Sequence, residues 1–139
     1  MKTQRLILIL LALTFVFAPQ SFTTAASARR NGYRAKLISP KAGDILLPGQ
    51  VVRIEWTAEF PEVDVTMCET EIVLSLDGGA TPYMFITSQR NPAVRHFDWT
   101  VPNMPTRTAV LDIRFGCLGI FAETSSIQVQ STFIISPLD

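Results

Sequence analysis

The feature that most constrains this fold is a short alternation of apolar and polar residues that recurs along the chain. In residues 51–57, for example, Val52, Ile54 and Trp56 are separated by polar residues. Successive side chains of a β-strand point to opposite faces, so such a run predicts a strand with one buried face. Further short strands are predicted at residues 35–39, 72–77, 83–87, 96–101, 111–115 and 127–135.

Turn-forming residues separate these runs, for example at residues 40–44, 77–79 and 102–105. No stretch keeps a helical periodicity for three turns without meeting Pro or Gly. About seven short strands in about 100 residues predict an all-β chain, a seven-strand antiparallel sandwich of immunoglobulin or fibronectin III type. In its last strand we expect Ile127, Val129 and Phe133 to face inward, opposite Gln128.

The N-terminus has the composition of a secretory signal peptide. Lys2 and Arg5 precede an almost wholly apolar run at residues 6–18, and residues 26–28 (Ala-Ser-Ala) resemble a signal-peptidase site. An uncleaved anchor is the alternative, but the apolar run is shorter than the roughly 20 residues that span a bilayer. We therefore expect cleavage after Ala28 and a secreted chain, extracellular or periplasmic, without a membrane span, a lipid-bearing Cys or a GPI-anchor signal.

Residues 1–28 are thus predicted to be the signal, residues 29–35 a linker and residues 36–136 a single folded domain. The chain has 12 Lys and Arg against 12 Asp and Glu. This balance argues against a protein that holds nucleic acid by its phosphates, because that requires a clustered basic surplus.

The two cysteines predict a disulfide. An even number of cysteines in an exported chain usually means a bond, and Cys68–Cys117 is the one possible pairing. In a seven-strand sandwich the third and sixth strands are antiparallel neighbours, so both cysteines would lie inward and close together. The alternative, a redox-active pair, lacks the C-x-x-C spacing.

Four segments together resemble a secreted immunoglobulin-like domain, at residues 38–44, 48–57, 72–81 and 97–102. The N-terminal domains of fungal Ser/Thr-rich GPI-anchored cell-wall proteins and many bacterial extracellular proteins have a similar pattern. The resemblance covers residues 36–135 and implies an extracellular accessory or adhesive module. The chain lacks the Ser/Thr-rich tail and the anchor signal of the fungal proteins.

Residues 75–81 also fit the S-x-D-x-G-x-T core of an Asp-box hairpin. Asp77 can accept backbone N–H bonds across the turn, and Gly78 or Gly79 can adopt a positive φ without steric cost. We therefore interpret Asp77 as structural rather than catalytic.

Two long connections, residues 58–70 and 116–125, are expected to meet at the disulfide end. They carry large apolar side chains next to acids, which is unusual for inert loops, although such side chains can simply cap the core. The candidate binding residues are Phe60, Glu62, Asp64, Met67, Leu118, Ile120 and Phe121. Acidic loops can also hold Ca²⁺, but no EF-hand spacing is present, and we expect neither a metal nor another cofactor.

We do not expect an enzyme. The one histidine, His96, has the outward parity of its strand, and Glu69 and Glu71 would need a sugar-binding cleft to act as glycosidase carboxylates. No nucleophile, zinc or phosphate-loop motif occurs. The sequence favours a non-catalytic module that binds an extracellular protein or cell-surface partner through one loop end.

Two alternatives stay open. The first is a carbohydrate-associated structural domain, for which the aromatic candidates are Tyr33, Tyr83, Trp56 and Trp99, the two tryptophans having core parity. The second is a small secreted hydrolase.

Overall fold

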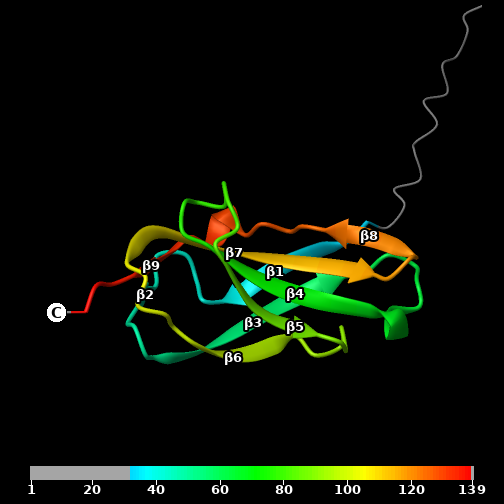
Figure 1. The fold of residues 1–139 in the computed structure, drawn as a ribbon, viewed down its shortest axis with the longest axis horizontal. Coiled ribbons are helices and arrows are strands. Elements are labelled where there is room, and N and C mark those ends of the chain that lie inside the picture. The colour runs from blue at the N-terminus through cyan, green and yellow to red at the C-terminus, as the bar shows by residue number, and fades with distance from the viewer. Residues whose placement is uncertain (1–31, 139) are drawn as a thin grey trace, which may run out of the picture.

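The computed structural model describes residues 32–138, which form two β-sheets and no α-helix (Figure 1). The smaller sheet has the order β1-β3-β6, made of β1 (Arg34–Ser39), β3 (Val51–Glu59) and β6 (His96–Thr100). The larger sheet has the order β2-β9-β7-β4-β5, made of β2 (Ile45–Leu46), β9 (Phe133–Ile135), β7 (Thr106–Cys117), β4 (Cys68–Ser75) and β5 (Met84–Gln89). An additional strand, β8 (Phe121–Thr124), pairs with the end of β7. The all-β prediction is confirmed.

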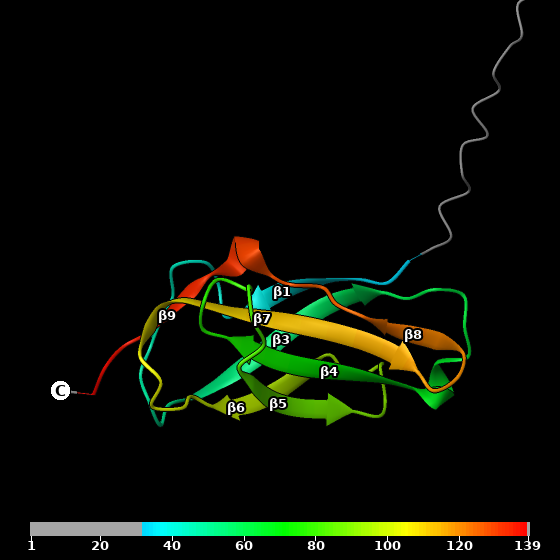
Figure 2. The same ribbon diagram turned by 45° about the horizontal axis from the view of Figure 1, so that its top comes forward.

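The two sheets pack face to face, as the crossing layers of Figure 2 show. Ile54 and Trp56 of β3 lie in one apolar cluster with Ile72 of β4 and with Leu111 and Ile113 of β7. All five side chains are at most 1% exposed. Their burial follows from the alternation in the sequence, because the apolar positions of each strand face the opposite sheet.

The predicted pairing of the third and sixth strands is confirmed, since β4 pairs with β7 in antiparallel orientation over the whole length of β4. Cys68 and Cys117 lie directly opposite each other in this ladder and form the disulfide. Both are buried beside Phe115 and Tyr33, in a second apolar cluster at this end of the molecule.

The last predicted strand is wrong in its middle. A short 3₁₀ turn, η2 (Val129–Ser131), interrupts residues 127–135 and changes the alternation before β9 begins. Gln128 is therefore buried, at 1% exposure, while Ile127 and Val129 are exposed at 42% and 58%. The side chain of Gln128 supplies the polar partners that its burial requires: its Oε1 accepts from the Leu37 N–H at 2.8 Å and its Nε2 donates to the Ser126 carbonyl at 2.6 Å.

Two boundaries also differ from expectation. The connection at residues 116–125 is not a plain loop, because β7 runs to Cys117 and β8 folds back along it. At the other boundary, β1 begins at Arg34 and Tyr33 is already buried, so the folded part starts before the expected end of the linker. The predicted signal, residues 1–28, and the first residues of the linker lie outside the described residues.

Within residues 32–138, no helix is long and apolar enough to cross a membrane.

Candidate binding groove

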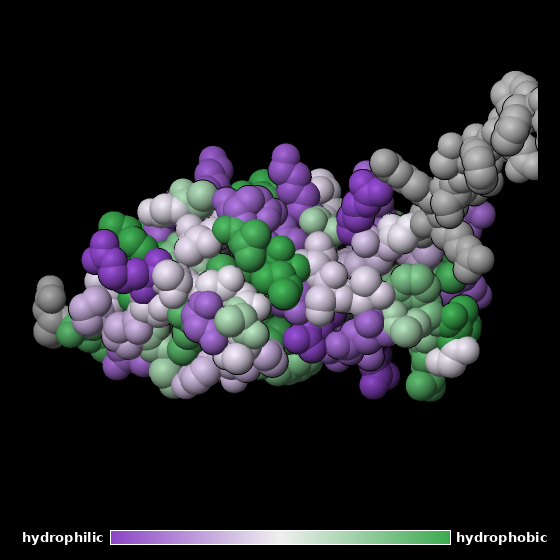
Figure 3. Space-filling view, turned by 90° about the horizontal axis from the view of Figure 1, so that it is seen from above, coloured by the Kyte–Doolittle hydropathy of each residue, from purple (hydrophilic) through white to green (hydrophobic). Residues whose placement is uncertain are grey.

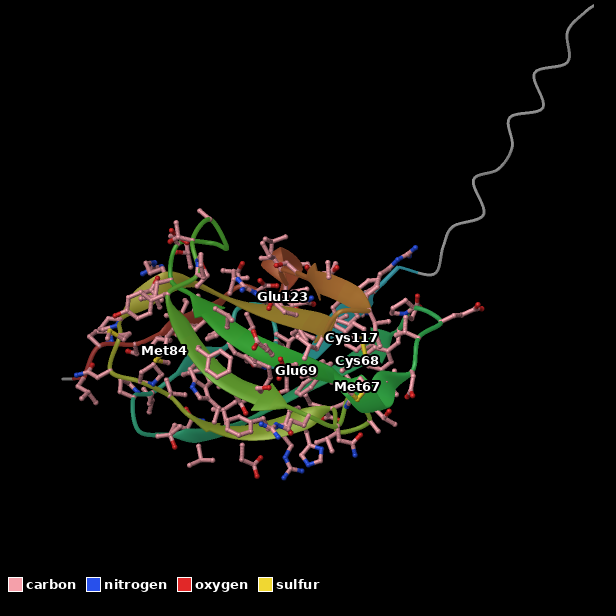
Figure 4. The ribbon with its side chains drawn as sticks, turned by 45° about the vertical axis from the view of Figure 1, so that its right-hand side comes forward. Met67, Cys68, Glu69, Met84, Cys117 and Glu123 are labelled. Carbon is pink, nitrogen blue, oxygen red and sulfur yellow. A yellow bond between two sulfur atoms is a disulfide. The ribbon has the colours of Figure 1, made fainter. Side chains whose placement is uncertain are left out.

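A groove of about 800 Å³ lies on the outer face of the larger sheet, beside the disulfide. One side is formed by the segment from Thr66 to Glu71 and the other by the β7–β8 hairpin, residues 114–123. Figure 4 shows Glu69 and Glu123 on this face, with Met67 and the disulfide at its end. The groove is therefore formed by outward residues of β4 and β7 as well as by the loops at this end of the molecule.

The rim of the groove is apolar and exposed. Leu118 is 87% exposed, Met67 58% and Ile120 57%. Leu118 and Ile120 flank Gly119, whose φ of +71° closes the tight turn between β7 and β8. Apolar surface gathers at this end of the molecule, to the right in Figure 3. Three exposed apolar side chains around one groove are the kind of feature that marks an interaction surface.

Gly116 allows the two walls of the hairpin to approach each other. A Cβ atom at this position would lie 3.1 Å from the Cα of Glu123, closer than ordinary van der Waals contact. The absence of a side chain at Gly116 therefore lets β8 lie against the end of β7, which brings Glu123 to the groove wall.

The walls carry an excess of carboxylates. Glu69 and Glu71 come from β4 and Glu123 from β8, while the cations lining the groove are Arg90 and Arg114. The guanidinium of Arg114 is already shared, with Nε 2.7 Å from Asp112 Oδ2 and one terminal nitrogen 3.1 Å from Glu123 Oε1.

Glu71 is the least compensated of these carboxylates. Partial burial raises its pKa, and the nearby charges of Glu123 and Glu69 raise it further, against a smaller opposing effect of Arg114. Glu69 has a hydrogen-bond partner, since its Oε2 accepts from the Ser88 hydroxyl at 2.6 Å. A positive charge entering the groove would thus relieve the repulsion among the carboxylates.

The structure divides the predicted binding residues into two groups. Met67, Leu118, Ile120 and Phe121 line the groove, whereas Phe60, Glu62 and Asp64 do not.

Phe60 is half-buried and packs against Phe115, with ring centroids 4.8 Å apart, while the Arg95 guanidinium lies 5.5 Å from its ring centroid. Asp64 caps η1 (Val65–Met67) by accepting from the Thr66 hydroxyl and backbone N–H at 2.7 and 3.0 Å, and these bonds lower its pKa. Glu62 is exposed on the connecting loop. Phe60 and Asp64 therefore stabilise this end of the fold.

The candidate binding residues predicted from the sequence did not include the charged residues of the groove wall. Glu69, Glu71 and Arg114 occupy outward positions of β4 and β7, where the alternation places polar side chains. Their proximity depends on the register of the ladder, in which Glu71 lies opposite Arg114. That register was not available from either strand by itself.

The Asp77 hairpin has the expected geometry, a carboxylate bonded across the turn and glycines with a positive φ. Asp77 accepts hydrogen bonds from the hydroxyls of Thr81 and Ser75, at 2.6 and 2.7 Å, and from the Thr81 N–H at 2.9 Å. Gly78 and Gly79 have φ values of +75° and +92°. The bonds to Thr81, followed by the one to Ser75, lower the pKa of Asp77 to about 2. Both oxygens of the Asp77 carboxylate therefore accept hydrogen bonds from residues of the turn.

The aromatic candidates for sugar stacking are mostly buried. Trp56 and Trp99 are 1% and 4% exposed, as their parity predicted, and Tyr33 is 6% exposed and stacked on Phe115. Of the four, Tyr83 alone is open to solvent, at 50%. Tyr83 is therefore the one of these four side chains that a sugar could reach.

Within the described residues, no three His, Cys, Asp or Glu side chains are grouped closely enough to hold a metal ion. The chain matches no family model, and no curated protein or solved structure matches it. The geometry of the groove is therefore the basis for a functional assignment.

Proposed function

We propose that this chain is a secreted, non-catalytic immunoglobulin-like domain that binds a basic and apolar segment of a protein partner in the groove beside the disulfide. The groove carries the proposal, because it combines an exposed apolar rim with an excess of carboxylates over cations in one concave surface. Exposed apolar area provides affinity, and complementary charge guides the encounter and orients the partner.

The strand arrangement supports the immunoglobulin-like assignment. The first two long strands, β1 and β3, share a sheet with β6, and β4 and β7 are neighbours in the other sheet. A two-sheet division with the third and sixth predicted strands paired is typical of immunoglobulin and fibronectin III domains. The disulfide and the signal-like composition of residues 1–28 support secretion.

The positions of the titratable groups support a non-catalytic role. His96 lies on β6 of the smaller sheet and is exposed, whereas Glu69 and Glu71 lie on the outer face of the larger sheet. His96 and the two glutamates thus lie on opposite faces of the molecule, so His96 cannot act together with them on one substrate. General acid–base catalysis requires such groups to converge within hydrogen-bond reach of the substrate.

Peptide binding to the oxidised protein tests the proposal. The probes are two fluorescently labelled peptides, one alternating Lys and Leu and the other alternating Glu and Leu, titrated with protein and followed by anisotropy. We expect the Lys-Leu peptide to bind more tightly, with an affinity that falls as salt is raised. The double variant Glu71→Gln/Glu123→Gln should reduce this preference.

The rim is tested by Leu118→Ser/Ile120→Ser, which should weaken binding by about tenfold, equivalent to about 1.4 kcal/mol. The matched control is Ile45→Ser/Leu47→Ser, which removes two exposed aliphatic side chains at the other end of the molecule. Equal losses in both double variants, or equal binding of the two peptides, would contradict the proposal.

A further inference from the structure

The outer edge of β5 has no strand paired with it among the described residues. β5 (Met84–Gln89) is the last strand of the larger sheet and pairs only with β4 among the described strands. Its other edge presents backbone N–H and C=O groups that are available to a further strand. Natural proteins usually protect such an edge with charged residues, Pro, a covering segment or a bulge.

The other long edges of the two sheets are protected. β1 carries Arg34 and Lys36, and its edge is covered where the Ser126 and Gln128 side chains bond to the backbone of Ala35 and Leu37. β6 carries His96 and an Asp98 carboxylate that pairs with Arg53 at 2.8 Å.

β5 differs, because residues 78–89 contain no charged side chain. Its one protective feature is a bulge at Ile86, where the register with β4 shifts.

The side chains of β5 have a symmetric facing pattern. Met84 and Ile86 pack against the main core, and Thr87 and Gln89 lie opposite the fully buried Ile72 and Thr70. Phe85 and Ser88 are exposed and lie opposite outward positions of β4. The pattern is therefore in, out, in, in, out, in, which reads the same in both directions.

This symmetry identifies the occupant of the edge. Directly opposite residues of an antiparallel pair point to the same face of the sheet. A second β5, related by a two-fold axis between Ile86 and Thr87, would place Phe85 opposite Ser88 and Met84 opposite Gln89, each pair on one face. An axis through Ile86 would instead place the outward Phe85 opposite the inward Thr87, and an axis through Thr87 would place the inward Ile86 opposite the outward Ser88. The side-chain pattern therefore favours the register with the axis between Ile86 and Thr87.

We infer that two copies of this chain associate through β5, forming an antiparallel pair that joins their larger sheets into one continuous sheet. Because β5 carries no charged side chain, pairing two copies brings no charge to the junction. Phe85 and Tyr83, at 56% and 50% exposure, supply apolar surface beside the junction. The inference rests on the edge of β5 rather than on the groove, and the two surfaces meet at Ser88, whose hydroxyl donates to the groove residue Glu69 at 2.6 Å.

Sedimentation of the oxidised protein over a range of concentrations tests the association. We expect a reversible monomer–dimer equilibrium that Phe85→Glu weakens by about tenfold, because the variant loses an apolar contact and places an acid at the junction. The matched control is Thr100→Glu, an exposed position on the β6 edge, which should leave the dimer unchanged.

The register is tested by the double variant Phe85→Glu/Ser88→Lys. If these two positions face each other across the axis, the opposite charges should restore dimerisation, whereas both single variants stay weaker than the unmodified chain. A protein that is monomeric at all concentrations, or a dimer insensitive to Phe85→Glu, would overturn the inference. Thermal unfolding of each variant verifies that it is folded.

Discussion

Gln128 connects the two sheets at the level of single hydrogen bonds. Its backbone N–H donates to the Leu111 carbonyl of β7 at 2.9 Å, while its side chain accepts from the Leu37 N–H of β1 at 2.8 Å. A buried amide is stable only where its own groups and those of its neighbours are paired. Gln128 thus serves as a polar link where backbone pairing between the sheets is impossible.

Replacing Gln128 by Leu should therefore destabilise the fold although it adds apolar surface. The variant leaves the Leu37 N–H and the Ser126 carbonyl without this partner, at a cost of about 2–3 kcal/mol. Urea denaturation measures the loss. The neighbouring Gln130 is exposed and its Nε2 donates to Gln128 Oε1 at 2.9 Å, so Gln130→Leu should cost no more than about 1 kcal/mol. Equal effects of the two variants would disprove the role of Gln128.

The lowered pKa of Asp77 predicts that the protein loses part of its stability in acid. Its pKa is lowered to about 2 in the folded state, against about 3.9 in unfolded chains. The stabilisation from its ionised form is therefore complete above about pH 4 and is lost as the pH falls towards about 2. The stability difference between the unmodified chain and Asp77→Asn, from urea denaturation at each pH, should shrink over this window. A difference that stays constant would contradict the assignment.

At the level of elements, the Asp77 hairpin packs against the segment between β8 and β9. A Cβ atom at Gly79 would lie 2.6 Å from Ile127 Cγ2 and 3.6 Å from Val129 Cγ1, whereas one at Gly78 meets open space. Both glycines have a positive φ. The two positions thus separate the cost of backbone strain from the cost of a packing clash.

Gly79→Ala should cost more than Gly78→Ala. Both substitutions strain the backbone by about 1–2 kcal/mol, but only Gly79→Ala also pushes on Ile127, adding about 1–2 kcal/mol. Chemical denaturation of the two variants measures the difference. If they are equally destabilised, the hairpin does not pack on Ile127 as described.

Interrupted elements explain where the strand predictions fail. The runs in β3 and β6 are correct because each strand is continuous and has one buried face. Residues 127–135 look like one strand, but η2 adds a turn that shifts the parity, and alternation by itself does not reveal where a strand breaks. The β7–β8 hairpin was missed because its exposed apolar tip lacks the usual alternation.

Across the whole molecule, the disulfide holds the groove end together. It joins β4 to β7 where the second apolar cluster, with Tyr33 and Phe115, closes the space between the sheets. The bond spans 49 residues of sequence, so it restricts the unfolded chain substantially.

The double variant Cys68→Ala/Cys117→Ala should lose roughly 4 kcal/mol of stability, as expected from the loop entropy. Reducing the unmodified chain should produce a similar loss, measured by urea denaturation with and without reductant. A loss below about 1 kcal/mol in both cases would show that the bond contributes little to the fold.

The sequence by itself determined most of the strand-forming segments, the inward positions of Trp56 and Trp99, the disulfide and the closed geometry of the Asp77 turn. The strands and the turn follow from local alternation and short-range hydrogen bonding, which act within one segment, and the disulfide follows from there being one possible pair of cysteines. The tertiary structure decided the burial of Gln128, the alignment of Glu71 with Arg114 and the open edge of β5. These depend on strand register and on which strands end the sheets, and both are set by contacts between segments far apart in the chain.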